Sequence, residues 1–363
     1  MRCLLVTLEY PPFYGGIANY YGHLVKAWPQ ADEVTVLDNN KGQLLAPQGK
    51  WPWRRSLVSL WRALKQGHYD FVLVGQILPL GTVVWLLSFI FPIKYGVFLH
   101  GMDWGEALKR PRKSWLAQRI LRRSALIIAA NNYTADLVKG TMPLLSSRII
   151  VVNPGIDSVE PPLVAPEYLA SLRQRYNLEG CQILLTVGRV VERKGVDKVL
   201  EALPQLLPYY PKLRYIILGN GPYLPVCQQL MADLGIKDEV IFITNATDEE
   251  KAAWYQLADI FIMPARAKDG DFEGFGIVYL EANQAGKPVI AGQSGGVGDA
   301  VVDGVTGLMV DPQSPRAIAQ AVRRLLNDES LRRQLGKNGQ ARLQQFLWPR
   351  QAHLLRDKIK EVL

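Results

Sequence analysis

Cysteine and histidine are scarce in this sequence, which contains three Cys and four His among its 363 residues. The cysteines, Cys3, Cys181 and Cys227, are odd in number, far apart and without metal-ligand spacing, so neither a disulfide framework nor a zinc site is expected. No Asp-x-Asp motif directly follows an expected strand, and we expect no bound metal ion and no cofactor. The apolar run at residues 3–8 is too short for the central part of a signal peptide. These absences favour a protein of the reducing cytoplasm.

Long uncharged segments are also few. One of them, residues 71–93, carries no charge over about the length that a bilayer core requires. Pro79 and Gly81 interrupt it where a continuous helix needs good helix formers. We therefore predict a buried strand over residues 71–74, a short apolar helix over residues 82–91, and no membrane span.

The composition is that of a folded globular protein, with 48% hydrophobic and 21% charged residues. A chain of this length exceeds what one hydrophobic core usually supports, so two domains are expected. The net charge of +9 is unevenly distributed along the chain. Residues 1–160 contain 18 Lys and Arg against 10 Asp and Glu, a net charge of +8, and the rest of the chain has a net charge of +1.

Most of this surplus lies in two segments, residues 51–65 and 109–123, in which bases are interleaved with Trp and Leu. These segments are either solvated helix faces or a surface for anionic lipid headgroups. Their tryptophans are Trp51, Trp53, Trp61 and Trp115. Nothing in the sequence resembles a nucleic-acid recognition module. An anionic membrane surface is therefore a candidate partner, and nucleic acid is not expected.

Apolar runs of strand length alternate with helical stretches along the chain. They cover residues 4–8, 34–37, 71–74, 95–99, 126–129 and 149–152 in the first half, and 183–187, 215–218, 240–243, 260–263 and 289–291 in the second. This alternation predicts parallel sheets buried on both faces. A proline-rich stretch at residues 161–166 separates the halves, and we predict an α/β protein of two doubly wound, Rossmann-like domains, residues 1–158 and 159–346. The carboxyl ends of the strands in both sheets are expected to face a central cleft.

Glycine-rich or basic segments follow three of the predicted strands. Gly16 precedes a helix after the first strand, where backbone N–H groups can approach an anion, with a plain structural turn as the alternative. Arg189 and Lys194 follow a strand of the second half. They suit a diphosphate, because Arg can donate two hydrogen bonds to phosphate oxygens and Lys supplies a compact positive charge. A solvated run of charges is the alternative. Gly219-Asn220-Gly221-Pro222 follows the next strand but lacks the third glycine of a dinucleotide fingerprint, so NAD binding is not expected.

The strongest motif is Glu273-Gly274-Phe275-Gly276-Ile277-Val278-Tyr279-Leu280-Glu281, in which two carboxylates are eight positions apart. A glycine-containing loop comes first, and a helix is predicted to begin near Gly276. Glu273 is therefore expected on the loop, able to face a substrate. The amides of Phe275 to Val278 form a helix N-terminus that can hold an anion. Glu281, one to two turns into the helix, can reach a ribose hydroxyl near the same anion.

This segment resembles the E-x7-E motif of the retaining glycosyltransferases of family 4, which have the GT-B fold. Other stretches that resemble the same family are Glu9-Tyr10-Pro11-Pro12, Gly15-Gly16, His100-Gly101, Val152 to Asp157, Gly188-Arg189, Lys194-Gly195, Gly219 to Pro222 and Ser294 to Gly298. The resemblance covers essentially the whole chain. Within the family, Pro264-Ala265-Arg266 followed by the segment from Glu273 to Ala282 most resembles bacterial phosphatidylinositol mannoside mannosyltransferases and their relatives.

The resemblance implies a role for each matching residue. The implied catalytic residues are His100 over the donor sugar, Arg189 and Lys194 at the donor diphosphate, and Glu273 at the donor sugar. For His100, a hydrogen-bonded histidine at a strand end is the alternative. The implied donor-binding residues are Gly16, Gly188, Gly219, Asn220, Phe275, Gly276, Ile277, Val278 and Glu281. A C-terminal helix, at about residues 347–363, is expected to pack back on the N-terminal domain.

The implied reaction is transfer of a hexose from a nucleotide-diphospho-sugar with retention of configuration, to a lipid-linked or glycan acceptor. GDP-mannose is the favoured donor and a UDP-sugar is the alternative. No protein nucleophile is implied, so the leaving diphosphate itself would help to deprotonate the acceptor hydroxyl. A sugar-nucleotide epimerase of the same fold and a non-catalytic lipid- or anion-binding protein stay open. The expected location is the cytoplasm, including the inner face of the cell membrane.

Overall fold

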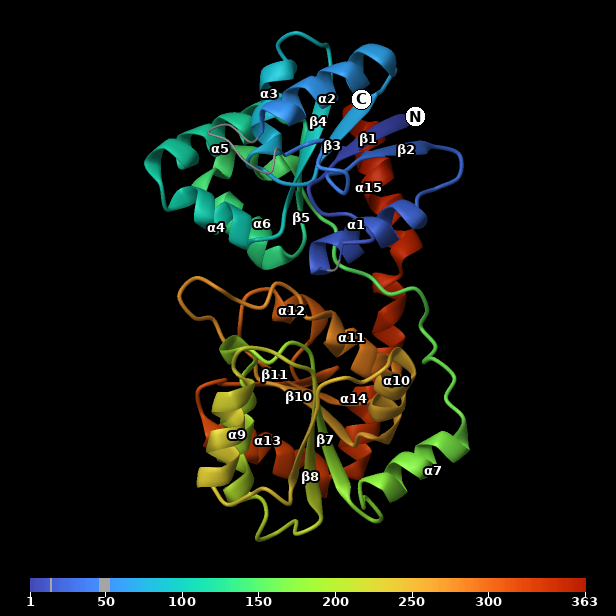
Figure 1. Ribbon diagram of the computed structural model, residues 1–363, viewed down its shortest axis with the longest axis vertical. Coiled ribbons are helices and arrows are strands. Elements are labelled where there is room, and N and C mark those ends of the chain that lie inside the picture. The colour runs from blue at the N-terminus through green and yellow to red at the C-terminus, as the bar shows by residue number, and fades with distance from the viewer. Residues whose placement is uncertain (14, 46–52) are drawn as a thin grey trace. The chain divides into compact units, whose positions relative to one another are not determined.

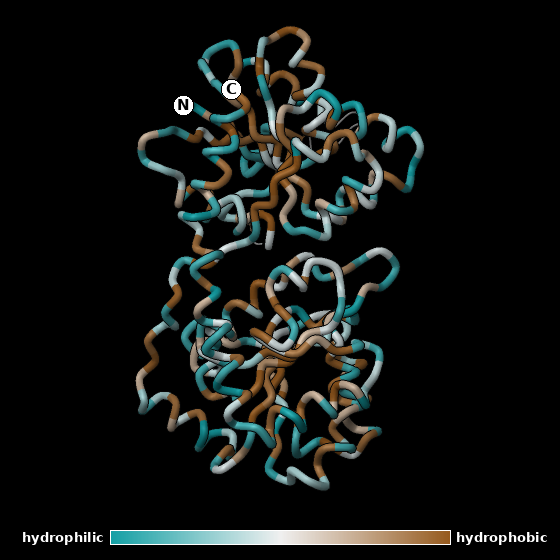
Figure 2. Tube along the Cα trace, turned by 180° about the vertical axis from the view of Figure 1, so that it is seen from behind, coloured by the Kyte–Doolittle hydropathy of each residue, from teal (hydrophilic) through white to brown (hydrophobic). Residues whose placement is uncertain are grey.

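The computed structural model describes residues 1–13, 15–45 and 53–363 (Figure 1). They form two compact units, one comprising Met1–Asp157 and Phe346–Leu363 and the other Ser158–Gln345. Each unit is built around its own six-stranded sheet, and all strand pairs within the sheets are parallel. Figure 2 shows that the most hydrophobic segments run through the centre of each unit. The predicted α/β class with two Rossmann-like sheets is therefore confirmed.

The sheet of the first unit has the strand order β2-β1-β3-β4-β5-β6. Its strands are β1 (Arg2–Val6), β2 (Glu33–Leu37), β3 (Phe71–Val74), β4 (Lys94–Leu99), β5 (Leu126–Ala129) and β6 (Ile149–Val151). Its helices are α1 (Gly16–Lys26), α2 (Arg54–Gln66), α3 (Leu80–Leu87), α4 (Met102–Leu108), α5 (Pro111–Arg123), α6 (Asn132–Thr141) and α15 (Trp348–Val362).

Helices cover both faces of this sheet. Leu4 and Val6 of β1 belong to a core that includes α2, α3 and α5, whereas Cys3 and Leu5 belong to a second core that includes α1 and α15. This alternation is the two-residue period of a strand that is buried on both sides. An apolar residue of α15 enters the second core at every third or fourth position: Trp348, Ala352, Leu355 and Ile359.

Ion pairs fix α15 to the edge of the same unit. The buried carboxylate of Asp32 accepts hydrogen bonds from the Met1 amino group at 2.8 Å and from Arg356 Nε at 2.6 Å, and Lys360 Nζ lies 3.3 Å away. At the other end of the helix, Lys94 Nζ donates to the carbonyl oxygen of Val362 at 2.9 Å. The segment after residue 345 is thus an integral part of the first unit.

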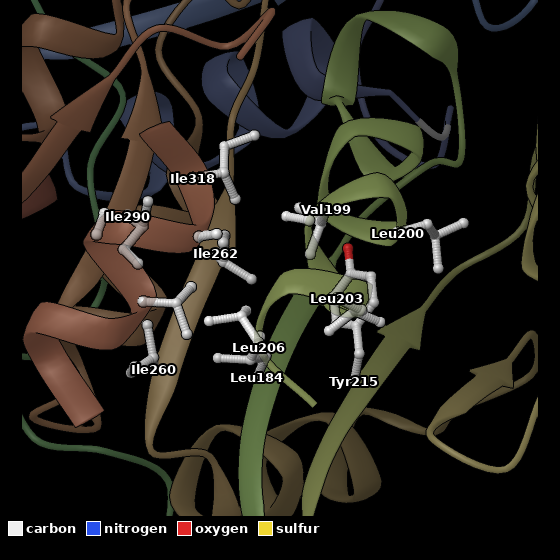
Figure 3. Close-up of a cluster of buried hydrophobic side chains, with 14 of the residues drawn as sticks. Leu184, Val199, Leu200, Leu203, Leu206, Tyr215, Ile260, Ile262, Ile290 and Ile318 are labelled. Atoms are coloured by element: carbon white, nitrogen blue, oxygen red, sulfur yellow. The ribbon is translucent and has the colours of Figure 1, made fainter. Parts of the chain in front are cut away.

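The sheet of the second unit has the strand order β12-β11-β10-β7-β8-β9. Its strands are β7 (Gln182–Val187), β8 (Leu213–Leu218), β9 (Val240–Ile243), β10 (Ile260–Met263), β11 (Val289–Gly292) and β12 (Gly307–Val310). Its helices are α7 (Pro166–Arg175), α8 (Val196–Ala202), α9 (Leu224–Asp233), α10 (Asp248–Leu257), α11 (Ile277–Gln284), α12 (Val297–Ala300), α13 (Pro315–Asn327) and α14 (Glu329–Arg342). Figure 3 shows part of its core, where Val199 of α8, Leu203 directly after α8 and Ile318 of α13 approach Leu184 and Ile262 of the sheet.

The strand register decides which loops lie together. Parallel pairing sets Ile260 of β10 opposite Leu184 of β7, and Val187 of β7 opposite Leu218 of β8. The carboxyl ends of these three strands therefore lie at one edge of the sheet. The loops that follow them, residues 188–195, 219–223 and 264–276, gather at this edge, where doubly wound sheets bind ligands.

Several predicted boundaries differ from the structure. The strand predicted over residues 4–8 ends at Val6, because the next backbone groups bond elsewhere: the Leu8 N–H donates to Gln76 Oε1 at 2.9 Å. The helix predicted over residues 82–91 is α3, which ends at Leu87. Pro166, predicted within the linker, is the first residue of α7, a position that suits proline. None of the helices that the structure describes combines the length and the apolarity that a membrane crossing needs.

Candidate active site

Two glycines let the loops at the edge of the second sheet pack closely. Gly219 has φ +146°, and a Cβ there would lie 2.0 Å from the carbonyl oxygen of Gly188. Gly195 has φ +75°, and a Cβ there would lie 2.3 Å from the carbonyl oxygen of Pro264. A side chain at either position would push neighbouring loops apart. These glycines therefore determine how closely the three loops approach one another.

A carboxylate and two cations meet at this edge. Glu273 Oε2 lies 2.6 Å from Lys194 Nζ and 2.6 Å from Arg193 Nη1. Glu273 lies on the loop before α11, and the two cations belong to the short 3₁₀ turn Glu192–Lys194. Lys194 and Glu273 are buried, with 9% and 8% of their surfaces exposed. The structure thus brings together two predicted site residues and adds Arg193, which was not among the predicted site residues.

The cations keep Glu273 ionised. Burial alone raises the pKa of the Glu273 carboxyl, but the charges and hydrogen bonds of Lys194 and Arg193 lower it more, so its pKa lies below the usual value. Arg193 Nε has a second carboxylate, Asp271, at 3.2 Å. Within the described parts of the chain, Lys194 has no acidic partner other than Glu273. The buried Lys194 charge is therefore balanced by this one carboxylate.

Arg189, the other predicted ligand of the diphosphate, lies outside this cluster. It follows Gly188 directly after β7, and its side chain is exposed. It makes no ion pair with any residue in the part of the chain that the structure describes. The cation that accompanies Lys194 at Glu273 is therefore Arg193.

A second, buried ion pair fixes the loops around the cluster. Arg266 Nη1 and Nη2 donate to Asp197 Oδ1 and Oδ2 at 2.9 and 2.8 Å, and both residues are almost fully buried. Arg266 Nη2 also lies 3.4 Å from Glu192 Oε1, and Lys268 pairs with the same glutamate. The backbone N–H of Arg266 donates to the carbonyl oxygen of Arg193 at 2.8 Å. These contacts join residues 264–276 to residues 188–195 and preorganise the cluster.

The predicted helix N-terminus is α11. It begins at Ile277, directly after Gly276, which has φ +79°. The dipole of the helix adds partial positive charge beside the loop that carries Glu273. Further along, Glu281 Oε2 accepts a hydrogen bond from Tyr255 Oη at 2.7 Å, and Lys251 Nζ donates to Oε1 at 3.2 Å. Glu281 is thus held by two side chains of α10 that the sequence analysis did not identify.

The first unit holds the other predicted site residues, His100 and Gly16. His100 lies between β4 and α4, and its Nε2 is 2.8 Å from Tyr21 Oη. Burial lowers the pKa of His100 to about 4, so the ring is neutral at pH 7. Gly16 is the first residue of α1, and a Cβ there would meet no heavy atom within 4 Å. In neither unit do three His, Cys, Asp or Glu side chains of the described residues form a group that could hold a metal ion.

Comparison with known proteins gives consistent family matches over both halves. Residues 14–160 match the family described as Glycosyltransferase Family 4, and residues 170–342 match the family described as Glycosyl transferases group 1. The chain is 31% identical over 348 residues to the GDP-mannose-dependent alpha-(1-6)-phosphatidylinositol monomannoside mannosyltransferase of Mycolicibacterium smegmatis, with 90% of this chain and 89% of that protein covered. It is 30% identical over 360 residues to the protein of the same name from Mycobacterium tuberculosis, with 93% and 92% covered.

A solved structure supports the same fold. The crystal structure of Anabaena HepE in complex with UDP matches with a TM-score of 0.81 at 19% identity, over 99% of this chain and 100% of that chain. This likeness concerns the arrangement of the backbone within two Rossmann-like halves. Together with the family matches it confirms the resemblance that the motifs indicate: the chain belongs to family 4 of the glycosyltransferases and is a hexosyltransferase with the GT-B fold.

Proposed function

We propose that this enzyme transfers mannose from GDP-mannose to a lipid-linked or glycan acceptor, with retention of the anomeric configuration. Two relatives at 31% and 30% identity are named as GDP-mannose-dependent phosphatidylinositol monomannoside mannosyltransferases, which supports this donor and a lipid acceptor. The observation that carries the proposal is the buried cluster of Lys194, Glu273 and Arg193 at the carboxyl edge of the second sheet. It supplies cationic charge for a diphosphate and a carboxylate for a sugar.

In the proposed complex, the donor diphosphate binds Lys194, Arg189 and the amides at the start of α11. A lysine is a compact charge for a phosphate, and an arginine forks onto two of its oxygens. The amides are those of Phe275, Gly276, Ile277 and Val278, where the helix dipole favours an anion. Glu273 then accepts hydrogen bonds from hydroxyls of the donor sugar.

The remaining assignments follow the loops. Glu281, fixed by Tyr255 and Lys251, accepts a hydrogen bond from the ribose. In the second unit Gly188, Gly219 and Asn220 line the donor at the ends of β7 and β8. In the first unit Gly16 leaves room for a phosphate at the start of α1, and His100 contacts the sugar.

The proposed reaction breaks the bond between the anomeric carbon and the diphosphate oxygen. An oxygen of the departing diphosphate takes the proton of the acceptor hydroxyl, and the acceptor oxygen bonds to the anomeric carbon on the face that the diphosphate leaves. Negative charge develops on the leaving group, where Lys194, Arg189 and the α11 amides stabilise it. Loss of one such preorganised group typically lowers kcat by about 10²–10³.

A nucleotide panel followed by a product assay tests the proposal. GDP, UDP and ADP are compared by thermal unfolding, since a ligand at about 100 times its Kd stabilises the native state by about 2.7 kcal/mol. Labelled GDP-mannose is then incubated with lipid extracts, and the organic phase is counted. We expect GDP to stabilise most and label to enter lipid. Preferential stabilisation by UDP would favour a UDP-sugar as the donor. Turnover of the nucleotide sugar without an acceptor would favour an epimerase. The absence of any turnover would favour a non-catalytic anion-binding protein.

We further propose that α2, α3 and α5 of the first unit form a surface that docks on an anionic membrane. Helix α3 packs against both α2 and α5. Helices α2 and α5 carry nine Lys and Arg: Arg54, Arg55, Arg62, Lys65, Arg112, Lys113, Arg119, Arg122 and Arg123. None of the three helices contains an acidic residue. Each base near an anionic leaflet contributes roughly 1 kcal/mol, so this face favours such a surface.

Aromatic side chains accompany these bases. Lys65 Nζ lies 4.9 Å from the ring centroid of Trp61, and Arg119 Cζ lies 5.3 Å from that of Trp115. Both tryptophans are exposed, as are Phe89 and Ile90 after α3. Of the other predicted tryptophans, Trp53 is half-buried, and Trp51 lies outside the described residues. Exposed aromatic rings beside bases suit the headgroup region of a bilayer.

Sedimentation with vesicles tests this surface. We expect binding to vesicles of 30% phosphatidylserine at low salt and release at high salt, because surface charges are screened over a Debye length of roughly 8–10 Å at physiological salt. The double change Arg62→Glu with Arg119→Glu should weaken binding about tenfold or more. The matched control is Arg323→Glu with Arg324→Glu on α13. If the wild-type protein stays in the supernatant at low salt, the proposed membrane surface is refuted, and the basic residues of α2 and α5 are a solvated surface.

A further inference from the structure

His100 is held in one orientation by its surroundings. The ring centroids of Tyr20 and Tyr21 lie 5.4 and 5.6 Å from that of His100, both edge-on, and the Phe98 ring is nearly parallel at 6.4 Å. The backbone N–H of His100 donates to Asp103 Oδ1 at 3.1 Å. Asp103 Oδ1 also accepts hydrogen bonds from the backbone N–H groups of Gly101 and Trp104, each at 2.9 Å. Both the ring and the backbone of His100 are thus constrained.

The hydrogen bonds around Tyr21 determine which nitrogen of His100 carries the proton. Tyr21 Oη lies 2.6 Å from the carbonyl oxygen of Gly75 and 2.8 Å from His100 Nε2. A carbonyl oxygen has no proton, so at 2.6 Å the phenol hydrogen must lie between the two oxygens. Tyr21 therefore has no hydrogen left for His100. The contact with Nε2 is a hydrogen bond only if Nε2–H donates to Tyr21 Oη.

The charge states around the ring support a neutral imidazole. Burial lowers the pKa of His100 to about 4, so at neutral pH the ring carries one proton. The titratable side chains near it are Tyr20 and Tyr21 on α1 and Asp103 on α4, and the charge of Glu9, after β1, acts on Tyr21. Burial first, and then the charge of neighbouring groups, raises the pKa of Tyr21 well above its usual value, so its phenol keeps its hydrogen. With Nε2 protonated, Nδ1 is left with a bare lone pair.

We propose that Tyr21 is a positioning residue that holds His100 in the Nε2–H form, so that Nδ1 accepts a hydrogen bond from a hydroxyl group of the substrate. The second half of this statement rests on the proposed role of His100 at the donor sugar. None of the described residues is a hydrogen-bond partner of Nδ1. A lone-pair acceptor suits a sugar hydroxyl and disfavours a phosphate oxygen, which has no hydrogen to donate at neutral pH. His100 then recognises the sugar part of the donor and acts neither as a cation nor as a general acid.

Nitrogen-15 NMR of the full-length protein tests the tautomer without reference to activity. The chain contains four histidines, so labelling on histidine gives few signals, and His100→Asn assigns the one of interest. We expect the wild type to show Nε2 protonated, Nδ1 unprotonated, an Nε2 proton protected from exchange with solvent, and no titration of the ring between pH 5.5 and 8. In Tyr21→Phe the protection should disappear and an Nδ1–H form should become populated.

Tyr20→Phe is the matched control. Tyr20 is buried on the same helix and donates through Oη to the carbonyl oxygen of Val152 at 2.8 Å, so this change also removes one buried hydroxyl-to-carbonyl bond. It leaves the bond between Tyr21 and His100 in place. The two variants should therefore unfold at similar temperatures, but only Tyr21→Phe should alter the His100 signals. In transfer assays we expect Tyr21→Phe to lower kcat about tenfold at unchanged nucleoside diphosphate affinity, and Tyr20→Phe to stay within about twofold of wild type.

Two results would overturn the proposal in different ways. Protonated Nδ1 in the wild type, or an unchanged Nε2–H signal in Tyr21→Phe, would refute the positioning role. Wild-type turnover in His100→Ala, which leaves no side-chain acceptor, would refute the contact of Nδ1 with substrate if the NMR results are as expected. Failure of the proposed mannosyl transfer itself would appear separately, in the nucleotide panel of the wild-type protein.

Discussion

Replacing Glu273 by Gln tests how the cluster of Lys194, Glu273 and Arg193 balances its charges. The change removes the negative charge that lies 2.6 Å from both Lys194 Nζ and Arg193 Nη1 but keeps the shape of the side chain. Arg193 retains Asp271 at 3.2 Å, whereas the buried Lys194 loses its acidic partner. Breaking a buried ion pair from one side costs about 3–5 kcal/mol. Because the amide oxygen of Gln still accepts a hydrogen bond, we expect about 3 kcal/mol, which lowers Tm by about 6–12 °C for a unit of this size.

The same change should strengthen binding of the nucleotide product. In the wild type a diphosphate must compete with Glu273 for Lys194, whereas in Glu273→Gln the uncompensated ammonium is available to it. A gain of about 1.4 kcal/mol corresponds to a tenfold lower Kd. Calorimetry with GDP measures this Kd, and thermal unfolding with and without GDP should show a larger stabilisation of the variant than of the wild type. Turnover should fall, because the carboxylate that is proposed to contact the sugar is lost.

Glu281→Gln is the control for this experiment, since its partners Lys251 and Tyr255 belong to α10 and not to the cluster. It should leave the affinity of the diphosphate group itself unchanged, which inorganic pyrophosphate can report. A GDP affinity of Glu273→Gln equal to or below that of the wild type would refute the reasoning, because Glu273 would then not compete with the diphosphate for Lys194.

Other changes separate binding from stability. Lys194→Ala should lower turnover about 100-fold or more and weaken GDP binding. Arg189→Ala should lower turnover and weaken GDP binding to a similar extent, but without lowering Tm, since the Arg189 side chain is exposed. Asp197→Asn breaks the bidentate pair with the buried Arg266 and should destabilise the enzyme by roughly 3 kcal/mol in urea unfolding, with nucleotide preference unchanged. Hydrogen bonds from the N-terminal amino group and from α15 hold the pKa of Asp32 below its usual value. The ionised carboxylate therefore stabilises the fold above about pH 4, and this stabilisation is lost as the pH falls further. Wild-type stability should therefore decline more steeply below about pH 4 than that of Asp32→Asn.

Most strands could be predicted well because they are continuous apolar runs. Apolar runs locate β3, β5, β9 and β10 at their observed ends. Strand β12 was not predicted, since it opens with Gly307 and its apolar run is only Leu308 to Val310. Helices α6, α7, α10 and α14 were not predicted either, because their outward faces are polar and their apolar stripes short. Their positions depend on packing against the sheet.

The candidate site could be predicted in part. Lys194 and Glu273 follow strand ends, and the parallel register brings such ends to one edge. Arg193 was missed because consecutive side chains of a 3₁₀ turn reach the same carboxylate, which neither strand nor helix periodicity indicates. The bond between Tyr21 and His100 joins residues 79 positions apart, and spacing within a motif carries no information on such a contact.

The interrupted course of the first unit has a consequence for biosynthesis. The ribosome adds roughly 5–20 residues per second, so about 10–40 s separate the synthesis of residue 157 from that of residue 363. During this interval α15 is not yet available, and the face of the first sheet that carries Leu5, Phe71 and Leu73 has α1 but lacks the part of its cover that α15 supplies. The second unit, continuous from Ser158 to Gln345, can finish folding earlier. The half that is translated first is thus completed last, and the part of its sheet that α15 later covers is the surface on which a chaperone would act in a nascent chain.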